Sequence, residues 1–275
     1  MNESAAHVRA TMSPLVPQTT GMEPKLPHLA GIKAVVFDLY GTLLISAAGG
    51  ASHEAGAAPE DLPGFEETFW ESVRMHQGRR RSAGVEYPEV EIREVWSDLL
   101  ARYGKPVASP AEIEALALRH ECRVNPVWPM PNAVGILKTL RDRGCLLGII
   151  SNAQFYTLPV MEGLFGADLD GLGFHPRLRV FSFEIGEGKP SPRLFSLLRD
   201  GAADLGVSAP EILYLGNDFH KDVIPARDAG FRTALFAGDA RSLRLGGVSA
   251  EEAVEIADAV ITDLAQVPGL LEKEY

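Results

Sequence analysis

The sequence predicts an α/β protein whose core is a doubly wound parallel, Rossmann-like sheet with a helical domain inserted into it. Short runs rich in β-branched residues alternate with helical patterns, which is typical of a parallel sheet covered by helices. Polar residues directly follow several of these runs, where such a sheet binds its ligands. Residues 47–128 instead hold helical patterns with no strand between them. We therefore expect a core domain of residues 31–46 and 129–275 and a helical cap domain of residues 47–128.

The composition is that of an ordinary globular protein with an acidic balance. The 275 residues include 26 Lys and Arg against 37 Asp and Glu, a formal net charge of −11, and 46% are hydrophobic. The missing basic surface argues against a nucleic-acid partner, and no apolar stretch approaches the ~20 residues of a membrane span. The only two cysteines, Cys122 and Cys145, exclude a disulfide framework and favour a reducing cytoplasm. The oligomeric state is not predicted by the sequence.

Residues 1–30 are expected to form a disordered extension. They contain four prolines among scattered Ser and Thr, and they show no sustained helical or strand period. His7 and Arg9 interrupt their apolar residues, so the stretch lacks the apolar centre of a signal peptide.

Regular structure is expected to begin at Ile32. The run 33–37 predicts a buried parallel strand, and the polar loop 38–42 follows it at once. Runs of the same kind predict five further strands, at residues 145–150, 180–183, 212–215, 233–236 and 259–261.

Helices are predicted between these strands and throughout the inserted region. Each core helix is followed by a glycine, the residue that best tolerates the left-handed conformation at a helix end. The core helices are expected at residues 133–143, 193–205 and 223–229, before Gly144, Gly206 and Gly230. In the inserted region, apolar positions three and four apart predict helices at residues 65–77, 90–103 and 111–123.

Four clusters of polar residues stand next to the predicted strands and helices. Because the carboxyl ends of parallel strands meet at one edge of a sheet, these clusters are expected to converge. They are Asp38 with Thr42, Ser151 with Asn152, Lys189 within the segment 188–192, and Asp218 with Asp222.

In order and spacing, the four clusters resemble those of the haloacid dehalogenase-like (HAD) hydrolase superfamily, over residues 31–265. The resemblance implies a hydrolase in which Asp38 attacks phosphorus and forms an aspartyl-phosphate that water then hydrolyses. Ser151 and Asn152 would donate hydrogen bonds to the phosphoryl oxygens, with Thr42 in a supporting role. Lys189 would be a compact cation beside both the nucleophile and the transferring group. The expected substrate is a small phosphorylated metabolite.

The resemblance also implies a magnesium ion. In similar enzymes two acids at the spacing of Asp218 and Asp222 hold Mg²⁺, one directly and the other through water or by orienting a neighbour. The nucleophile Asp38 and the backbone carbonyl of Tyr40 would complete the protein ligands. Few oxygen ligands, with water filling the octahedron, are what Mg²⁺ prefers.

Tyr40 departs from the pattern of the family's phosphatases. These usually carry a second Asp two residues after the nucleophile, as general acid and base, and here that position is Tyr40. The metal ligand at this position is the backbone carbonyl, so Mg²⁺ binding is unaffected. Proton delivery to the leaving oxygen, a contribution of about 10²–10⁴-fold, is lost. We expect either leaving groups of low pKa or an acid supplied by the inserted region.

Two alternatives remain open. The form Asp-x-Tyr-Gly-Thr at residues 38–42 also occurs in L-2-haloacid dehalogenases, in which the aspartate displaces halide without a metal. Those enzymes carry a halide-binding Arg early in the insertion and lack an acid matching Asp218, whereas residues 43–73 here contain no Arg or Lys. A non-catalytic binding protein on the same scaffold is the other alternative, although it would have no reason to retain all four clusters.

The inserted region carries a basic cluster that could contact the substrate. Arginine forks suit carboxylates and phosphates, so His76 or Arg93 is a candidate to bind the substrate or to replace the missing acid. The alternative is that the cluster is solvated or pairs with nearby glutamates. It consists of Arg74, His76, Arg79, Arg80, Arg81 and Arg93, and the glutamates are Glu86, Glu89, Glu91 and Glu94.

Overall fold

The computed structural model describes residues 2–48, 64–105 and 109–271. Its centre is a six-stranded sheet in the order β5-β4-β1-β6-β7-β8, in which all neighbouring strands are parallel. The chain order reverses at β1, which lies between β4 and β6, so the predicted doubly wound α/β core is confirmed. The strands are β1 (Ala34–Phe37), β4 (Leu146–Ser151), β5 (Phe174–Phe181), β6 (Ile212–Gly216), β7 (Arg232–Phe236) and β8 (Ala259–Ile261).

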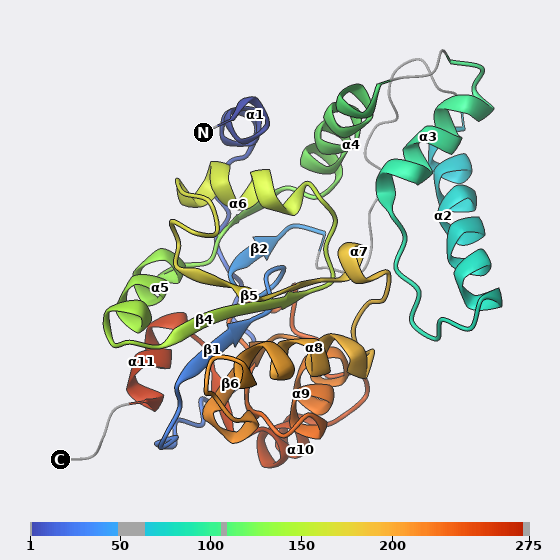
Figure 1. Cartoon of the computed structure of the whole chain (residues 1–275). Coiled ribbons are helices and arrows are strands. Elements are labelled where there is room, and N and C mark those ends of the chain that lie inside the picture. The colour runs from blue at the N-terminus through green and yellow to red at the C-terminus, as the bar shows by residue number, and fades with distance from the viewer. Residues whose placement is uncertain (1, 49–63, 106–108, 272–275) are drawn as a thin grey trace.

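Helices cover both faces of the sheet (Figure 1). Three of them, α5, α6 and α11, lie over one face, and α8, α9 and α10 lie over the other. The three glycines predicted to end core helices all have positive φ. Within the described ranges, no helix has the length and apolar character to cross a membrane. The helices are α5 (Ala133–Asp142), α6 (Thr157–Phe165), α7 (Ser182–Ile185), α8 (Pro192–Ala203), α9 (Ile224–Asp228), α10 (Ala250–Ile256) and α11 (Val267–Leu270).

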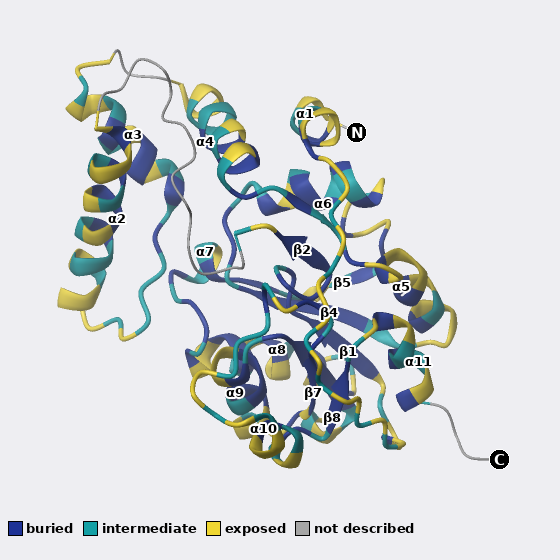
Figure 2. Cartoon of the chain, turned by 180° about the vertical axis from the view of Figure 1, so that it is seen from behind, coloured by how far each residue is buried: buried dark blue, intermediate teal, exposed yellow. Residues whose placement is uncertain are grey.

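Alternate side chains of each strand enter different hydrophobic clusters. In β1, Val35 and Phe37 pack in the cluster that contains side chains of α5, α6 and α11. Ala34 and Val36 pack with side chains of α8 and α9 on the opposite face. All four β1 residues are fully buried, and Figure 2 shows the sheet in dark blue with the exposed residues mainly on the outer helices and loops. An apolar run without polar alternation is what a strand covered on both faces requires.

Between β1 and α5, the described residues form two short strands with three helices between them. The strands β2 (Leu44–Ser46) and β3 (Val127–Pro129) pair antiparallel, and neither was predicted, because three residues are too few for a recognisable period. The helices α2 (Phe65–Ser82), α3 (Ile92–Arg102) and α4 (Pro110–Val124) confirm the three predicted in this region. We call α2–α4 the helical insertion. The predicted domain boundary at 128 falls inside β3, and the one at 47 adjoins residues 49–63, which lie outside the described residues.

The helical insertion has a hydrophobic cluster of its own, rich in aromatic rings. Trp96 of α3 is buried and lies 5.5 Å from the ring of Phe65 and 6.0 Å from that of Phe69, both from α2. His120 of α4 completes the group at 5.4 Å from Trp96. Aromatic pairs at these separations stabilise beyond the area that they bury, so the three helices form a unit beside the core (Figure 1).

The expectation of a disordered N-terminal extension is wrong for the residues that the structure describes. Helix α1 (Glu3–Thr11) buries Ala5 and Val8 against α6, and a Cβ at Gly163 of α6 would lie 2.5 Å from the Ala5 carbonyl oxygen. Further along, Lys25 pairs antiparallel with Val260 of β8. The sequence pattern missed this because α1 buries only two residues and its partners are far away in the chain.

Candidate active site

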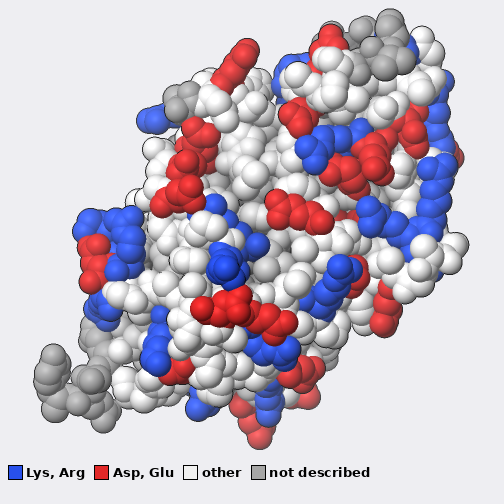
Figure 3. Space-filling view, viewed as in Figure 1, with Lys and Arg blue, Asp and Glu red and all other residues white. Residues whose placement is uncertain are grey.

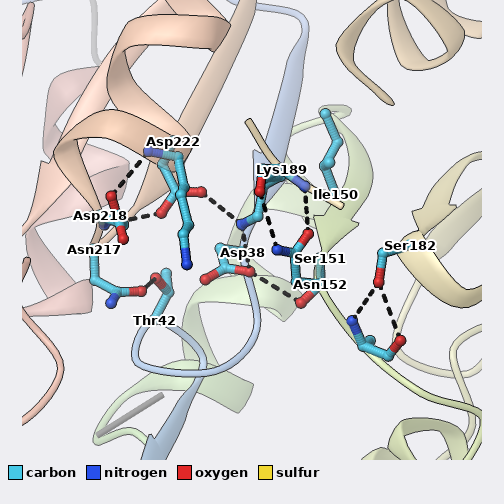
Figure 4. Close-up of polar contacts among 12 residues, drawn as sticks. Asp38, Thr42, Ile150, Ser151, Asn152, Ser182, Lys189, Asn217, Asp218 and Asp222 are labelled. Carbon is cyan, nitrogen blue, oxygen red and sulfur yellow. Dashed lines mark hydrogen bonds and ion pairs between the residues drawn. The ribbon is translucent and has the colours of Figure 1, made fainter. Parts of the chain in front are cut away.

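The predicted clusters meet at the carboxyl ends of β1, β4 and β6 (Figure 4). Asp38 directly follows β1, Ser151 is the last residue of β4, and Asp218 stands two residues after β6. Lys189 reaches them from the loop that precedes α8. Because β1 lies between β4 and β6 in the sheet, the strand order itself brings these side chains together.

Asp38 is buried and held by two side chains. Its Oδ1 accepts a hydrogen bond from the Ser151 hydroxyl at 3.0 Å and lies 2.8 Å from the Lys189 Nζ. Its backbone N–H donates to the Leu215 carbonyl of β6 at 2.8 Å, which fixes the start of the loop. Burial raises the pKa of Asp38 to about 6, against the opposing effect of Lys189 and with a further increase from Asp222. The carboxyl is thus ionised at neutral pH, yet poorly solvated.

Lys189 lies among three oxygens. Besides Asp38, its Nζ is 2.5 Å from Asp222 Oδ1 and donates to the Tyr214 hydroxyl at 3.2 Å. Burial acts to lower the pKa of Lys189, but Asp222 and Asp38 outweigh it and the pKa is raised. The ammonium is therefore charged at neutral pH. Sequence reasoning missed Tyr214, because a tyrosine in a buried strand looks like any other core residue.

Asp222 is fully buried and uses both of its oxygens within the protein. Oδ1 accepts from Lys189 and from the Tyr214 hydroxyl, the latter at 2.9 Å, and Oδ2 accepts the Asp218 backbone N–H at 2.9 Å. A Cβ at Gly216 would lie 2.3 Å from the Asp222 carboxyl carbon, so only glycine fits there. Asp222 is predicted as a direct or indirect magnesium ligand, and in this structure both of its oxygens are engaged with protein groups.

Asp218 begins a π-helical turn, η2 (Phe219–Val223), and is half-buried. Its Oδ1 accepts the backbone N–H groups of His220 at 3.0 Å and Lys221 at 2.9 Å. Its Oδ2 accepts no hydrogen bond from the described residues. The loop therefore holds the Asp218 carboxylate by one oxygen and leaves the other unengaged.

Thr42 and Asn152 hold the loops of the site. The buried Thr42 hydroxyl donates to Asn217 Oδ1 at 3.1 Å, and the Asn217 amide donates to the Ser242 carbonyl at 2.6 Å. Asn152 Oδ1 accepts the Lys189 backbone N–H at 2.6 Å, and its Nδ2 donates to the Lys189 carbonyl at 3.3 Å. Asn152 was predicted to contact the substrate, but its amide is already engaged with the backbone of Lys189.

The Tyr40 side chain is directed to helix α6. Its hydroxyl is 2.9 Å from the Thr157 hydroxyl, and its ring packs against the core cluster. Burial, and next the charge of Glu121, raise the pKa of Tyr40, so the phenol stays protonated at neutral pH. No hydrogen bond among the described residues links the Tyr40 hydroxyl to Asp38, so the phenol is turned away from that carboxylate.

His76 and Arg93 form their ion pairs inside the helical insertion. His76 Nε2 lies 2.8 Å from Asp98 Oδ2. Arg93 lies 2.7 Å from Glu91 and 3.0 Å from Glu114. Among the described residues, neither side chain forms a hydrogen bond or ion pair with Asp38, Ser151 or Lys189, so the prediction that they bind substrate gains no support. Both side chains contact acidic neighbours, and Glu91, the partner of Arg93, is one of the glutamates named in the alternative interpretation.

The rest of the predicted basic cluster lies mainly at the outer surface. Arg74, Arg79 and Arg81 of α2 are exposed, and basic side chains line the edge formed by α2 in Figure 3. On the remainder of that face, acidic and basic groups are interspersed. Arg80 differs, because its Nη1 donates to the Gly186 carbonyl at 3.4 Å and so reaches the core.

A loop of the helical insertion is bonded to the segments that carry Ser151 and Lys189. We call residues 87–92 the docking loop. The Tyr87 carbonyl accepts the Gly188 N–H at 2.9 Å, next to Lys189. Glu89 accepts from Ser182 at 2.7 Å and from Gln154 at 3.2 Å, and burial raises the pKa of Glu89. No sequence pattern predicted these contacts, which join the helical insertion to the edge of the site.

The unengaged oxygens of the site suit a small, hard cation. Oδ2 of Asp38 and Oδ2 of Asp218 accept no hydrogen bond from a described side chain, and the Tyr40 carbonyl accepts none from the described backbone. Mg²⁺ takes few carboxylate and carbonyl oxygens and completes its octahedron with water. Within the residues described, no group of three or more His, Cys, Asp or Glu side chains could hold a metal, so a cage of protein side chains is not available there.

The chain is similar in sequence to proteins named as phosphatases and similar in fold to a solved dehalogenase. A phosphoserine phosphatase of Thermus thermophilus is 38% identical over 120 residues, 43% of each chain. A glyceraldehyde 3-phosphate phosphatase of Methanocaldococcus jannaschii is 27% identical over 206 residues, 74% of this chain and 83% of the relative. The solved structure of a 2-haloacid dehalogenase from Pseudomonas syringae superposes with a TM-score of 0.59 at 22% identity, covering 87% of this chain and 97% of that one.

The match to a protein family covers most of the chain. The family model of the haloacid dehalogenase-like hydrolases matches residues 32–230, which include every strand from β1 to β6 and all four polar clusters. The predicted superfamily and the predicted hydrolase class are confirmed. The chain belongs to the haloacid dehalogenase-like hydrolase family.

Proposed function

We propose that this hydrolase is a magnesium-dependent phosphatase that acts on a small phosphorylated metabolite through an aspartyl-phosphate on Asp38. One observation carries the proposal: a buried carboxylate lies between the Lys189 ammonium and the Ser151 hydroxyl, with the Asp218 carboxylate in the neighbouring loop. Phosphoryl transfer needs a placed nucleophile and charge stabilisation more than elaborate covalent chemistry. Relatives named as phosphatases support the same reaction class.

In the first step an oxygen of Asp38 bonds to phosphorus while the bond from phosphorus to the leaving oxygen breaks. Lys189 and the Ser151 hydroxyl stabilise the negative charge of the transferring group. Held by Asp38, Asp218 and the Tyr40 carbonyl, Mg²⁺ would offset the charge on the phosphoryl oxygens. In the second step water attacks phosphorus, the bond from phosphorus to the Asp38 oxygen breaks, and the proton of the water passes to solvent, which releases phosphate and returns the Asp38 carboxylate.

The leaving group must depart without a strong general acid. The hydroxyl of Tyr40 is engaged with Thr157, and no other described acid contacts Asp38 except its ion-pair partner Lys189. General acid catalysis contributes about 10²–10⁴-fold, and the largest losses fall on poor leaving groups. Acyl phosphates and p-nitrophenyl phosphate should therefore be hydrolysed faster than phosphate esters of simple sugars.

A hydrolysis screen with and without Mg²⁺ tests the proposal. Phosphate release should require Mg²⁺ and should be abolished by Asp38→Asn. The matched control is Asp142→Asn, because Asp142 is exposed and pairs only with Lys138 on the surface of α5. Phosphate release that persists in Asp38→Asn would refute the proposed nucleophile.

Dehalogenation is the second candidate, and Tyr40 is the observation that favours it. The same screen therefore includes 2-chloropropionate. Chloride release without metal, in place of phosphate release, would establish this alternative. The presence of Asp218 opposes it, because a carboxylate with no paired cation beside a carboxylate substrate would repel that substrate.

We also propose that residues 47–128 act as a cap over the site. The docking loop supports this, since Glu89 and Tyr87 contact the segments next to Ser151 and Lys189. Covering the reacting atoms would exclude water from the transfer step. The substrate-binding residues of such a cap would then come from the side of the helical insertion that faces Asp38.

A further inference from the structure

We propose that Tyr214 is a positioning residue, whose hydroxyl fixes the Lys189 ammonium beside the nucleophile Asp38. The role in turnover rests on the proposed phosphatase function, whereas the role in orienting Lys189 does not. Tyr214 lies in the middle of β6, and its hydroxyl is in contact with both Lys189 and Asp222. Only 1% of Tyr214 is exposed, and its hydroxyl contacts Lys189, Asp222 and the Ile150 carbonyl rather than Asp38.

The three N–H bonds of the Lys189 ammonium match the three oxygens around it. Nζ lies 2.8 Å from Asp38 Oδ1, 2.5 Å from Asp222 Oδ1 and 3.2 Å from the Tyr214 hydroxyl. The Tyr214 hydroxyl donates its own proton to Asp222 Oδ1 at 2.9 Å, the nearer of two acceptors, the other being the Ile150 carbonyl at 3.2 Å. A lysine has three donors and a hydroxyl both donates and accepts, so the group is mutually satisfied.

The Tyr214 hydroxyl is held by rigid neighbours. The backbone of Tyr214 is in register with Val36 in the centre of the sheet, and its ring lies 5.4 Å from the ring of Phe195 of α8. Lys189, in contrast, stands in a loop and carries its charge on a flexible four-carbon stem. The position of its ammonium is therefore set by the oxygens that it meets.

The reaction changes only one of the three contacts. When Asp38 bonds to phosphorus, it ceases to be a free carboxylate, and its contact with Lys189 is shared with the phosphoryl oxygens. The contacts with Asp222 and Tyr214 are unaffected by that step. These two contacts therefore hold the ammonium next to the reacting atoms. The Tyr214 hydroxyl contributes to both, because it also bonds to Asp222.

The substitution Tyr214→Phe tests this role, because it removes the hydroxyl and keeps the ring. We expect kcat with p-nitrophenyl phosphate to fall about tenfold, within the range for a hydrogen bond to a charged group. KM should be unchanged, since Tyr214 does not reach the substrate. Tyr103→Phe is the matched control: its hydroxyl donates to Thr68 within the helical insertion, and kcat should be that of the natural protein. Tyr214→Leu is a second hydroxyl-free variant with the same expected loss.

A measurement independent of turnover follows the ammonium itself. In ¹⁵N–¹H NMR of the full chain, assigned with Lys189→Arg, the Lys189 ammonium should give a slowly exchanging signal that Tyr214→Phe abolishes or broadens. The proposal would be overturned if the natural protein gave no such signal, or if the signal were unchanged in Tyr214→Phe. It would also be overturned if the kcat of Tyr214→Phe were within twofold of the natural value. If the natural protein released no phosphate, the proposed function would fail while the ammonium signal still decided the role of Tyr214.

Discussion

At the scale of single residues, the Asp38 carboxylate is subject to opposing influences. Burial disfavours its charge, whereas Lys189 at 2.8 Å favours it, and the pKa is raised to about 6. A carboxylate that is ionised but weakly solvated has few water molecules to shed before it attacks. The same burial would make the proposed magnesium site sensitive to pH.

Protons should compete with Mg²⁺ for Asp38. Above pH 6 the carboxylate is ionised in the metal-free protein and can bind the cation, whereas below pH 6 it is increasingly protonated. The apparent Mg²⁺ affinity should thus be constant above pH 7 and fall by up to about tenfold per pH unit below 6. Isothermal titration calorimetry between pH 5 and 8 measures this. Asp38→Asn should abolish this pH dependence of the Mg²⁺ affinity. If the affinity of the natural protein did not change with pH, Asp38 would not be a ligand.

Removing the Tyr40 hydroxyl should leave turnover unchanged. In Tyr40→Phe the hydrogen bond to Thr157 is lost, at a cost of about 1 kcal/mol in the free energy of unfolding. Because the backbone carbonyl is retained and the phenol does not deliver a proton, kcat should stay within twofold. Urea unfolding and steady-state kinetics test both parts, and a kcat reduced a hundredfold would identify the phenol as the missing acid.

At the scale of elements, the docking loop joins two units with separate hydrophobic clusters. Gln154 is the centre of this contact: its Nε2 donates to the Val90 carbonyl at 2.9 Å and its Oε1 accepts the Ile92 N–H at 3.1 Å. The helical insertion also shares buried side chains with the core through α4, because Cys122 packs in the main core cluster. Its position relative to the core therefore depends on these contacts and on the packing of Phe155 and Tyr156 against its hydrophobic cluster.

Gln154→Ala should release the docking loop. The Ile92 N–H then loses its acceptor, which costs roughly 1–3 kcal/mol locally and corresponds to about 5- to 150-fold faster amide exchange. Hydrogen exchange with mass spectrometry should show the loss of protection at residues 87–92 and little change in β1 and β6. Gln77→Ala on α2 is the control, since its side chain makes no hydrogen bond with other described residues. Unchanged exchange in Gln154→Ala would show that the loop is held by other contacts.

At the scale of the whole molecule, the N-terminal stretch is part of the fold. Deletion of residues 1–11 would expose the surface of α6 that Ala5 and Val8 bury and would keep the buried Met12. We expect the free energy of unfolding to fall by roughly 2–3 kcal/mol, the value of burying one large and one small apolar side chain. Gly163→Ala should destabilise the full chain but not the truncated one, because its Cβ would meet the Ala5 carbonyl. The four proteins to compare are the full and the truncated chain, each with and without Gly163→Ala. Equal urea midpoints for all four would contradict the packing of α1 against α6.

The sheet was predictable from the sequence because strands buried on both faces are continuous apolar runs. The convergence of Asp38, Ser151, Lys189 and Asp218 was predictable because each adjoins a strand or helix whose place in the sheet is fixed. Tyr214 could not be identified, since its role depends on which loops fold back over β6. The pairing of Arg93 and the contacts of the docking loop depend equally on neighbours that the local pattern does not specify.

Trapping the phosphorylated protein tests the central claim most directly. The protein would be mixed with Mg²⁺ and p-nitrophenyl phosphate, quenched in acid within a single turnover and digested for mass spectrometry. We predict one phosphoryl group, on the peptide that contains Asp38, in the natural protein and none in Asp38→Asn. A phosphoryl group on another residue, or phosphate release with no modified peptide at any time, would contradict the mechanism.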